Sequence, residues 1–253
     1  MGNLLGSNPV ARRRPVLLGL VALWTPLLAV AACGGDDKSD NFAQTEATST
    51  TETTTGLLPC DQDRHMVAFD VIGFLTQENV ELVGPWVDTG TTPTPRAGTV
   101  ELANAYRERG YEILYLTTLE ASMDLHGQPV GDAMSQWLVD SGYPMGEGIG
   151  QLWVWDGTRT DDGQTWVSIT DELLRLAGEG VTMDAGYSEN ADKIYAMATG
   201  GVAAEHLYSL TSPPAVAGAP SSAPSVPIPG DDVVAHLATI QALSPVCQVA
   251  AIG

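Results

Sequence analysis

The chain has 253 residues and carries 31 Asp and Glu against 11 Lys and Arg, which gives a formal net charge of −20 at pH 7. Because a nucleic-acid-binding protein must offer a basic surface to the phosphates, this balance argues against nucleic acid as a partner. The 44% hydrophobic content is enough for a core, and the part of the chain that can fold has the length of one domain.

The N-terminus has the pattern of an export signal. Arginines at 12–14 precede the apolar run 16–32, which ends in small residues before Cys33. A basic start, an apolar stretch and small residues are typical of a secretory signal peptide. The end of this run resembles the lipobox of bacterial lipoproteins. That resemblance implies that residues 1–32 are removed, that Cys33 is diacylated with palmitate-type chains, and that the protein is held by lipid on the outer face of the cell membrane. A transmembrane anchor is the alternative, although the run is short for a span.

Residues 33–59 are predicted to be a disordered tether. This segment is rich in Thr and other polar residues and lacks the periodicity of a core-forming element. So few apolar groups cannot offset the entropy lost when the chain becomes ordered. The tether would hold the folded domain away from the membrane.

The domain itself is predicted to span 60–250, with its core in residues 65–210. A proline-rich connector, 211–230, is predicted to be extended and semi-rigid. The acidic start at Asp231 and the apolar spacing after it predict a C-terminal helix over 231–243.

Apolar runs and helical patterns alternate within this core. Runs of consecutive apolar residues predict strands that are buried on both faces. We expect strands at 66–72, 112–117, 152–155, 181–185 and 204–210. Three helices are expected to be capped at Thr99, Ser168 and Ser188. A further helix is indicated by the apolar stripe within 130–141. Such alternation predicts a three-layer, Rossmann-like α/β fold with a parallel sheet and helices on both faces. Ligands of such sheets bind beyond the carboxyl ends of the strands.

Two cysteines remain if Cys33 carries lipid. Cys60 and Cys247 lie at opposite ends of the domain, in a chain predicted to be exported, where disulfides persist. We therefore expect a disulfide that ties the C-terminal region to the first strand. Closing so long a loop is worth roughly 4 to 5 kcal/mol by chain-entropy reasoning. Two unpaired, buried thiols are the alternative.

Polar residues follow the predicted strands at their carboxyl ends. Asp70 lies in the first apolar run, Thr117 ends the second, and the segment 188–192 follows the fourth. A carboxylate in an apolar strand is costly to bury unless it has a partner or a metal. The coincidence of three such strand ends favours a functional site, and the alternative for Asp70 is a carboxylate that accepts loop N–H groups.

These strand ends carry a resemblance to the haloacid dehalogenase (HAD) superfamily. Residues 69–76, Phe-Asp-Val-Ile-Gly-Phe-Leu-Thr, are similar to its first motif, Asp-x-Asp-Gly-Thr-x-Thr; residues 110–118 resemble the second motif and residues 186–192 the fourth. The second motif and the helix with Trp137-Leu138 are closest to the lipin-type phosphatidate phosphatase domain. The resemblance covers about residues 65–210 and implies a HAD-like fold without an inserted cap.

The resemblance also assigns roles, and several positions depart from them. Asp70 fills the place of the nucleophile that accepts the phosphoryl group, and Thr117 that of the second-motif Thr. Ile72 stands where the family has its general acid, a group worth roughly 10²–10⁴ in rate. Phe74 replaces the Thr of the first motif, and no Lys lies between 160 and 192 to serve as the third-motif cation.

The same resemblance implies a magnesium site. Its ligands would be Asp70, the Ile72 carbonyl, Asp192 and Glu189, with Ser188 in place of Glu189 if the alignment shifts by one residue. Hard oxygen ligands completed by water suit Mg²⁺.

Three functions from different classes remain open. The first is a pseudoenzyme: a degenerate lipin-like module that binds a phosphorylated small molecule or lipid headgroup without turning it over. The second is an active magnesium-dependent phosphatase-type hydrolase with Asp70 as nucleophile and His126 or Glu189 as the acid. The third is an envelope scaffold for a protein partner that the sequence does not identify. The missing acid and cation favour the first.

Overall fold

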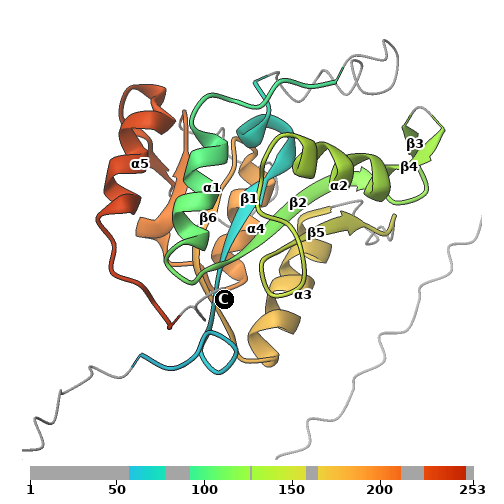
Figure 1. Cartoon of the computed structure of the whole chain (residues 1–253). Coiled ribbons are helices and arrows are strands. Elements are labelled where there is room, and N and C mark those ends of the chain that lie inside the picture. Colours follow the sequence, from blue (N-terminus) through green and yellow to red (C-terminus); the bar gives the residue numbers. More distant parts are fainter. Residues whose placement is uncertain (1–56, 78–91, 126, 158–164, 212–224, 249–253) are drawn as a thin grey trace, which may run out of the picture. The chain divides into compact units, whose positions relative to one another are not determined.

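A parallel sheet forms the centre of the fold in the computed structural model, which describes residues 57–77, 92–125, 127–157, 165–211 and 225–248 (Figure 1). Its six strands lie in the order β5-β2-β1-β6-β7-β8, and every neighbouring pair is parallel. They are β1 (Arg64–Asp70), β2 (Glu112–Glu120), β5 (Gly150–Trp155), β6 (Val181–Tyr187), β7 (Leu207–Ser209) and β8 (Val226–Pro227). A small antiparallel pair, β3 (Asp124–Leu125) and β4 (Gln128–Pro129), lies apart from this sheet.

Helices cover both faces of the sheet, which confirms the predicted three-layer α/β architecture. One face packs against α1 (Thr99–Arg107), α2 (Val130–Asp140) and α5 (Val233–Gln241), and the other against α3 (Thr165–Gly178) and α4 (Ala191–Thr199). Because side chains alternate along a strand, β1 supplies both cores. Val67 and Phe69 belong to the first core, and Met66 and Ala68 to the second.

The strand order places a switch in chain direction beside β1. Numbered along the chain, the sheet runs 3-2-1-4-5-6, the order of Rossmann-type sheets. The chain moves outward from β1 to β2 and β5, then returns to β6 on the other side of β1. Crossovers that leave in opposite directions create the crevice in which such folds bind ligands. Asp70, the last residue of β1, lies at this point.

A helical turn follows β1, so the first strand is shorter than predicted. The strand ends at Asp70, and Val71–Leu75 form one wide helical turn in which Gly73 has φ 106°. The Arg96 guanidinium donates hydrogen bonds to the carbonyl oxygens of Gly73, Phe74 and Thr76, at 2.7 to 2.9 Å. The chain therefore leaves the sheet immediately after the carboxylate.

Three predicted helix caps were wrong. Helix α1 is capped by Gly98 rather than Thr99, and Ser168 lies inside α3. Helix α4 is capped by Asn190, whose side chain accepts from the backbone N–H groups of Asp192 and Lys193, and Ser188 lies before the helix with its hydroxyl donating to Asp70. The fifth strand is also shorter than expected, since Ala204–His206 form a 3₁₀ turn before β7.

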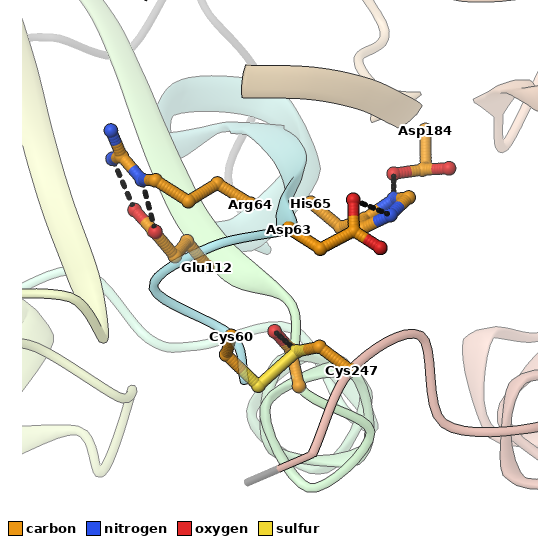
Figure 2. The surroundings of a disulfide bond; sticks show 8 residues. Cys60, Asp63, Arg64, His65, Glu112, Asp184 and Cys247 are labelled. Atoms are coloured by element: carbon orange, nitrogen blue, oxygen red, sulfur yellow. Dashed lines mark hydrogen bonds and ion pairs between the residues drawn. A yellow bond between two sulfur atoms is a disulfide. The ribbon is translucent and has the colours of Figure 1, made fainter. Parts of the chain in front are cut away.

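The C-terminal part packs against the first helix and is linked covalently to the segment before β1. Cys60 and Cys247 form a disulfide with a Cα–Cα distance of 4.9 Å, as predicted (Figure 2). Gly110 lies against it with φ +93°, and a Cβ at this position would overlap the Cys247 sulfur. Arg109 adds hydrogen bonds to the Gln241 and Leu243 carbonyl oxygens at the end of α5.

Several predicted features lie outside the described residues: the signal 1–32, Cys33, the tether up to residue 56, His126 and the connector residues 212–224. The described end of that connector includes β8 and a 3₁₀ turn, Pro229–Asp231. Helix α5 falls within the predicted C-terminal helix. In the parts of the chain that the structure describes, no helix is long and apolar enough to cross a membrane.

Candidate functional site

The candidate site is centred on the Asp70 carboxylate, which is fully buried at the carboxyl end of β1. Its Oδ1 is paired with the Lys193 ammonium, and its Oδ2 accepts a hydrogen bond of 2.7 Å from the Ser188 hydroxyl. Both carboxylate oxygens are therefore held by protein groups.

Neighbouring elements bring these partners together. Strand β6 pairs with β1 through Phe69 and Tyr187, so Ser188 emerges beside Asp70. The Asn190 cap then starts α4, which places Lys193 in the first turn above the strand end. Ser188 links the strand end to the helix cap, because its Oγ also accepts from the Asn190 backbone N–H at 2.9 Å.

Burial dominates the electrostatics of this group. Desolvation raises the pKa of Asp70, whereas the Lys193 ammonium and the hydrogen bonds from Ser188 and Ile72 oppose that rise. The lysine side chain is only 3% exposed and the aspartate 0%. A buried pair of this kind is held in place strongly, because removing either partner leaves an uncompensated charge away from water.

Thr117 lies on the adjacent strand, and within the described residues it is not bonded to Asp70, Ser188 or Lys193. Strand β2 pairs with β1 so that Asp70 lies opposite Leu116, one residue before Thr117. The Thr117 side chain is fully buried, and its Oγ1 accepts from the backbone N–H of Leu119 at 3.2 Å. It therefore lies near the predicted strand end and, among the described residues, makes no hydrogen bond to the Asp70 carboxylate.

In the described part of the chain, the carboxylates predicted to bind magnesium do not bond to one another, and those of Asp70 and Glu189 have separate partners. The Glu189 carboxylate accepts hydrogen bonds from the backbone N–H of Leu210 and from Thr211, which ties it to the segment after β7. Asp192 lies in the first turn of α4, and Asp70 is paired with Lys193. Among the described residues, no group of three or more His, Cys, Asp or Glu is arranged to hold a metal. These positions do not fit a preformed magnesium shell, since an ammonium already lies on the central carboxylate.

Lys193 is the residue that the sequence analysis missed. The resemblance places its cation within 160–192, and Lys193 lies just after that range, on α4. One signal could have found it: Asn190 is a good N-cap, and a helix that begins there carries position 193 over the strand end.

A cluster of aromatic rings packs at this end of the sheet, on the face covered by α1 and α5. Tyr187, the last residue of β6, stacks on Phe69 with a centroid distance of 4.7 Å and on Tyr208 at 4.9 Å. Its hydroxyl is within hydrogen-bond distance of Tyr106 Oη, at 2.7 Å, and of His236 Nε2, at 3.0 Å. Burial lowers the pKa of His236 and raises those of the tyrosines.

The carboxyl end of the sheet therefore carries a carboxylate, a hydroxyl and an ammonium that are bonded to one another and shielded from water. Such a cluster can fix β1, β6 and α4 relative to each other, and as it stands it does not present a nucleophile to solvent. Comparison of the chain with family models and with curated proteins found no match.

Proposed function

We propose that this protein is a lipid-anchored module of the bacterial envelope, with a capless HAD-like domain that does not turn over phosphate esters. The ligand class that the motif resemblance suggests, a phosphorylated small molecule or lipid headgroup, would be bound without hydrolysis. The supporting features are the Rossmann-type strand order, Asp70 at the switch point and Thr117 on the neighbouring strand.

The enclosure of Asp70 carries the non-catalytic part of this proposal. A nucleophilic carboxylate must reach the phosphorus atom, yet both oxygens of Asp70 are held by Lys193 and Ser188, and its side chain has no exposed surface. The position two residues later is Ile72, which cannot donate a proton to a leaving group. Asp70 is therefore not accessible for attack on phosphorus, and the leaving group has no acid at position 72 to protonate it.

One observation favours the alternative, an active hydrolase. Lys193 supplies a cation beside Asp70, the role of the third-motif lysine that the sequence analysis left unfilled. For this alternative, opening of the Lys193 contact would have to expose Asp70 to a substrate and to Mg²⁺.

A panel of phosphate monoesters, tested with and without Mg²⁺, separates the two functions. We expect no phosphate release by the wild-type chain above that of the Asp70→Asn variant. Magnesium-dependent release that Asp70→Asn removes, in a variant that still melts cooperatively, would establish the hydrolase instead. Asp140→Asn, on an exposed residue at the end of α2, is the matched control.

Ligand binding without turnover has its own measurement. A ligand that binds only the folded state raises stability by RT ln(1 + [L]/Kd), about 2.7 kcal/mol at a hundredfold excess over Kd. Inorganic phosphate or a short-chain phosphatidate should therefore raise the melting temperature, and Lys193→Met should reduce the rise. If neither probe shifts the melting temperature, the scaffold function replaces the ligand-binding one.

The anchor is tested separately, at Cys33. Cys33→Ala should abolish lipid attachment and move the protein out of the detergent phase or leave the signal uncleaved. Unchanged detergent partitioning and normal processing would contradict the lipoprotein assignment.

A further inference from the structure

A polar cavity lies at the end of the sheet opposite to Asp70, where β1 and β2 begin. Its volume is about 600 Å³, within the range of small-ligand sites, and its walls include Cys60, Asp61, Arg64, Arg107, Glu112 and Glu147. Figure 2 shows the Arg64 and Glu112 side chains extending toward each other on one side of the Cys60–Cys247 disulfide.

Two of the charges in this cavity neutralise each other. Arg64 Nε donates to Glu112 Oε1 at 2.7 Å, and Arg64 Nη2 donates to Glu112 Oε2 at 2.8 Å. This two-bond arrangement satisfies the guanidinium fork and the carboxylate together. The pair thus forms a fixed, neutral part of the wall.

Three other charges in the cavity have no partner among the residues that the structure describes. Within the described parts of the chain, the side chains of Arg107, Asp61 and Glu147 make no hydrogen bond or ion pair. One guanidinium and two carboxylates, on three separate segments, therefore remain available to a ligand.

The segments that carry these charges are held in place by backbone bonds. Glu147 lies on a tight turn in which Gly146 N donates to the Gly150 carbonyl at 2.9 Å, and Ile113 N bonds the Ile149 carbonyl at 2.9 Å. Asp61 follows the disulfide, and Arg107 ends α1. Preformed walls reduce the ordering cost of binding a small molecule.

We propose that this cavity binds a small zwitterion that carries both an ammonium and a carboxylate, which means a free amino acid or a short peptide with free ends. The carboxylate would take the bidentate position on Arg107, and the ammonium would lie between Asp61 and Glu147. A purely anionic ligand in this cavity would be repelled by Asp61 and Glu147, and a purely cationic one would leave Arg107 unpaired.

This site is independent of the proposed function, because it lies at the amino end of β1 whereas Asp70 ends that strand. Calorimetric titration of the purified full chain with the dipeptide Ala-Ala tests it directly. Acetylation of the dipeptide's amino group or amidation of its carboxylate should each weaken binding about tenfold or more, the size of one charge-assisted hydrogen bond. Alanine in parallel shows whether the site prefers an amino acid or a peptide.

Two variants assign the charges to residues. Arg107→Gln should weaken Ala-Ala binding about tenfold and remove the difference between Ala-Ala and its amide. Glu147→Gln should reduce the effect of acetylation in the same way. Arg175→Gln and Asp140→Asn change the same charges outside this cavity and should leave the Kd unchanged.

The proposal is overturned by any of three results. The first is the absence of binding heat for both Ala-Ala and alanine at about 10 mM, well above a weak Kd. The second is equal affinity of the wild-type chain for the free and the doubly blocked dipeptide, a comparison that needs no folded variant. The third is an equal loss of affinity in the site variants and the two control variants.

Discussion

Strand β1 begins at one ion pair and ends at another, and the two pairs differ in burial rather than in chemistry. At its amino end, the side chain of Arg64 is 33% exposed and that of its partner Glu112 is 13% exposed. At its carboxyl end, Asp70 is 0% and Lys193 is 3% exposed. Water competes for the first pair and screens it, whereas the second pair has only its own members and Ser188 to satisfy it. Burial, and not the number of bonds, decides which pair the fold depends on.

The same contrast extends to the space around each pair. At the carboxyl end, where Rossmann-type sheets keep their ligand sites, the Asp70 cluster and the stacked rings around Tyr187 are buried. The amino end has a cavity whose remaining charges have no partner among the described residues. If this contrast is correct, substitutions at the carboxyl end should cost mainly stability, and substitutions at the amino end mainly binding.

The largest effect is expected from Lys193→Met. This change leaves the Asp70 carboxylate buried without its counter-ion, so the free energy of unfolding at pH 7 should fall by about 3–5 kcal/mol in urea titrations. Without Lys193, the folded-state pKa of Asp70 lies further above its unfolded value, so the loss should shrink as the pH falls toward that unfolded value.

A double variant checks the explanation. Asp70→Leu/Lys193→Met removes both charges and should recover most of the lost stability, because an apolar pair needs no compensation. A single-variant loss below about 1 kcal/mol would mean that the pair behaves like a surface pair, and the contrast between the two ends would not hold.

The second effect concerns the disulfide beside the amino-end cavity. Cys60→Ser/Cys247→Ser should lower the free energy of unfolding by about 2–5 kcal/mol, because the unfolded chain gains the freedom of a long loop. Reduction of the wild-type chain should give a similar loss in urea titrations, and the same reductant should not change the double variant. An unaltered wild-type transition after complete reduction would contradict this prediction.

The third effect is the pH dependence contributed by His236 at the carboxyl end. Burial lowers its pKa, and it packs against Tyr187 and Tyr208. The stability that its neutral form provides is present above the unfolded value of about 6.5. It should be lost as the pH falls through the lowered folded-state pKa, by at most about 1.4 kcal/mol per pH unit.

The matched comparison is His236→Gln, which cannot take up that proton. Its free energy of unfolding should vary less between pH 7 and 5 than that of the wild type. Parallel pH curves for the two proteins would assign the acid sensitivity to other groups.

The smallest effect is expected at the amino end itself. Arg64→Gln should change the free energy of unfolding by less than about 1 kcal/mol, because the pair with Glu112 is partly exposed to water and to salt. High salt should reduce the effect further. A loss as large as that of Lys193→Met would show that exposure does not separate the two pairs.

Periodicity was sufficient to predict the sheet, but not the bonds within the site. Consecutive apolar residues in β1 and β2, separated by the α1 pattern, indicated a parallel sheet because burial on both faces leaves a direct trace in the sequence. The Cys60–Cys247 pair followed from counting cysteines in a chain predicted to be exported. Strand β8 was missed because two residues ending in Pro carry too little pattern.

The site was harder because its partners come from separate elements. Asp70 was predicted correctly as a strand-end carboxylate, but its pairing with Lys193 depends on where α4 begins. Moving the cap from Ser188 to Asn190 brings Lys193 into the first helical turn. The Ser188 hydroxyl donates to a carboxylate from another strand, and such a tertiary contact leaves no local pattern in the sequence.

The closing disulfide also has a mechanical consequence. Cys60 and Cys247 join the two ends of the domain, so the chain between them forms a covalent ring. A pull applied between the segment before Cys60 and the segment after Cys247 would pass from one sulfur to the other and would not load the strands inside the ring. Tension between these two flanking segments would therefore be borne by a covalent bond, while the folded domain stays unstretched.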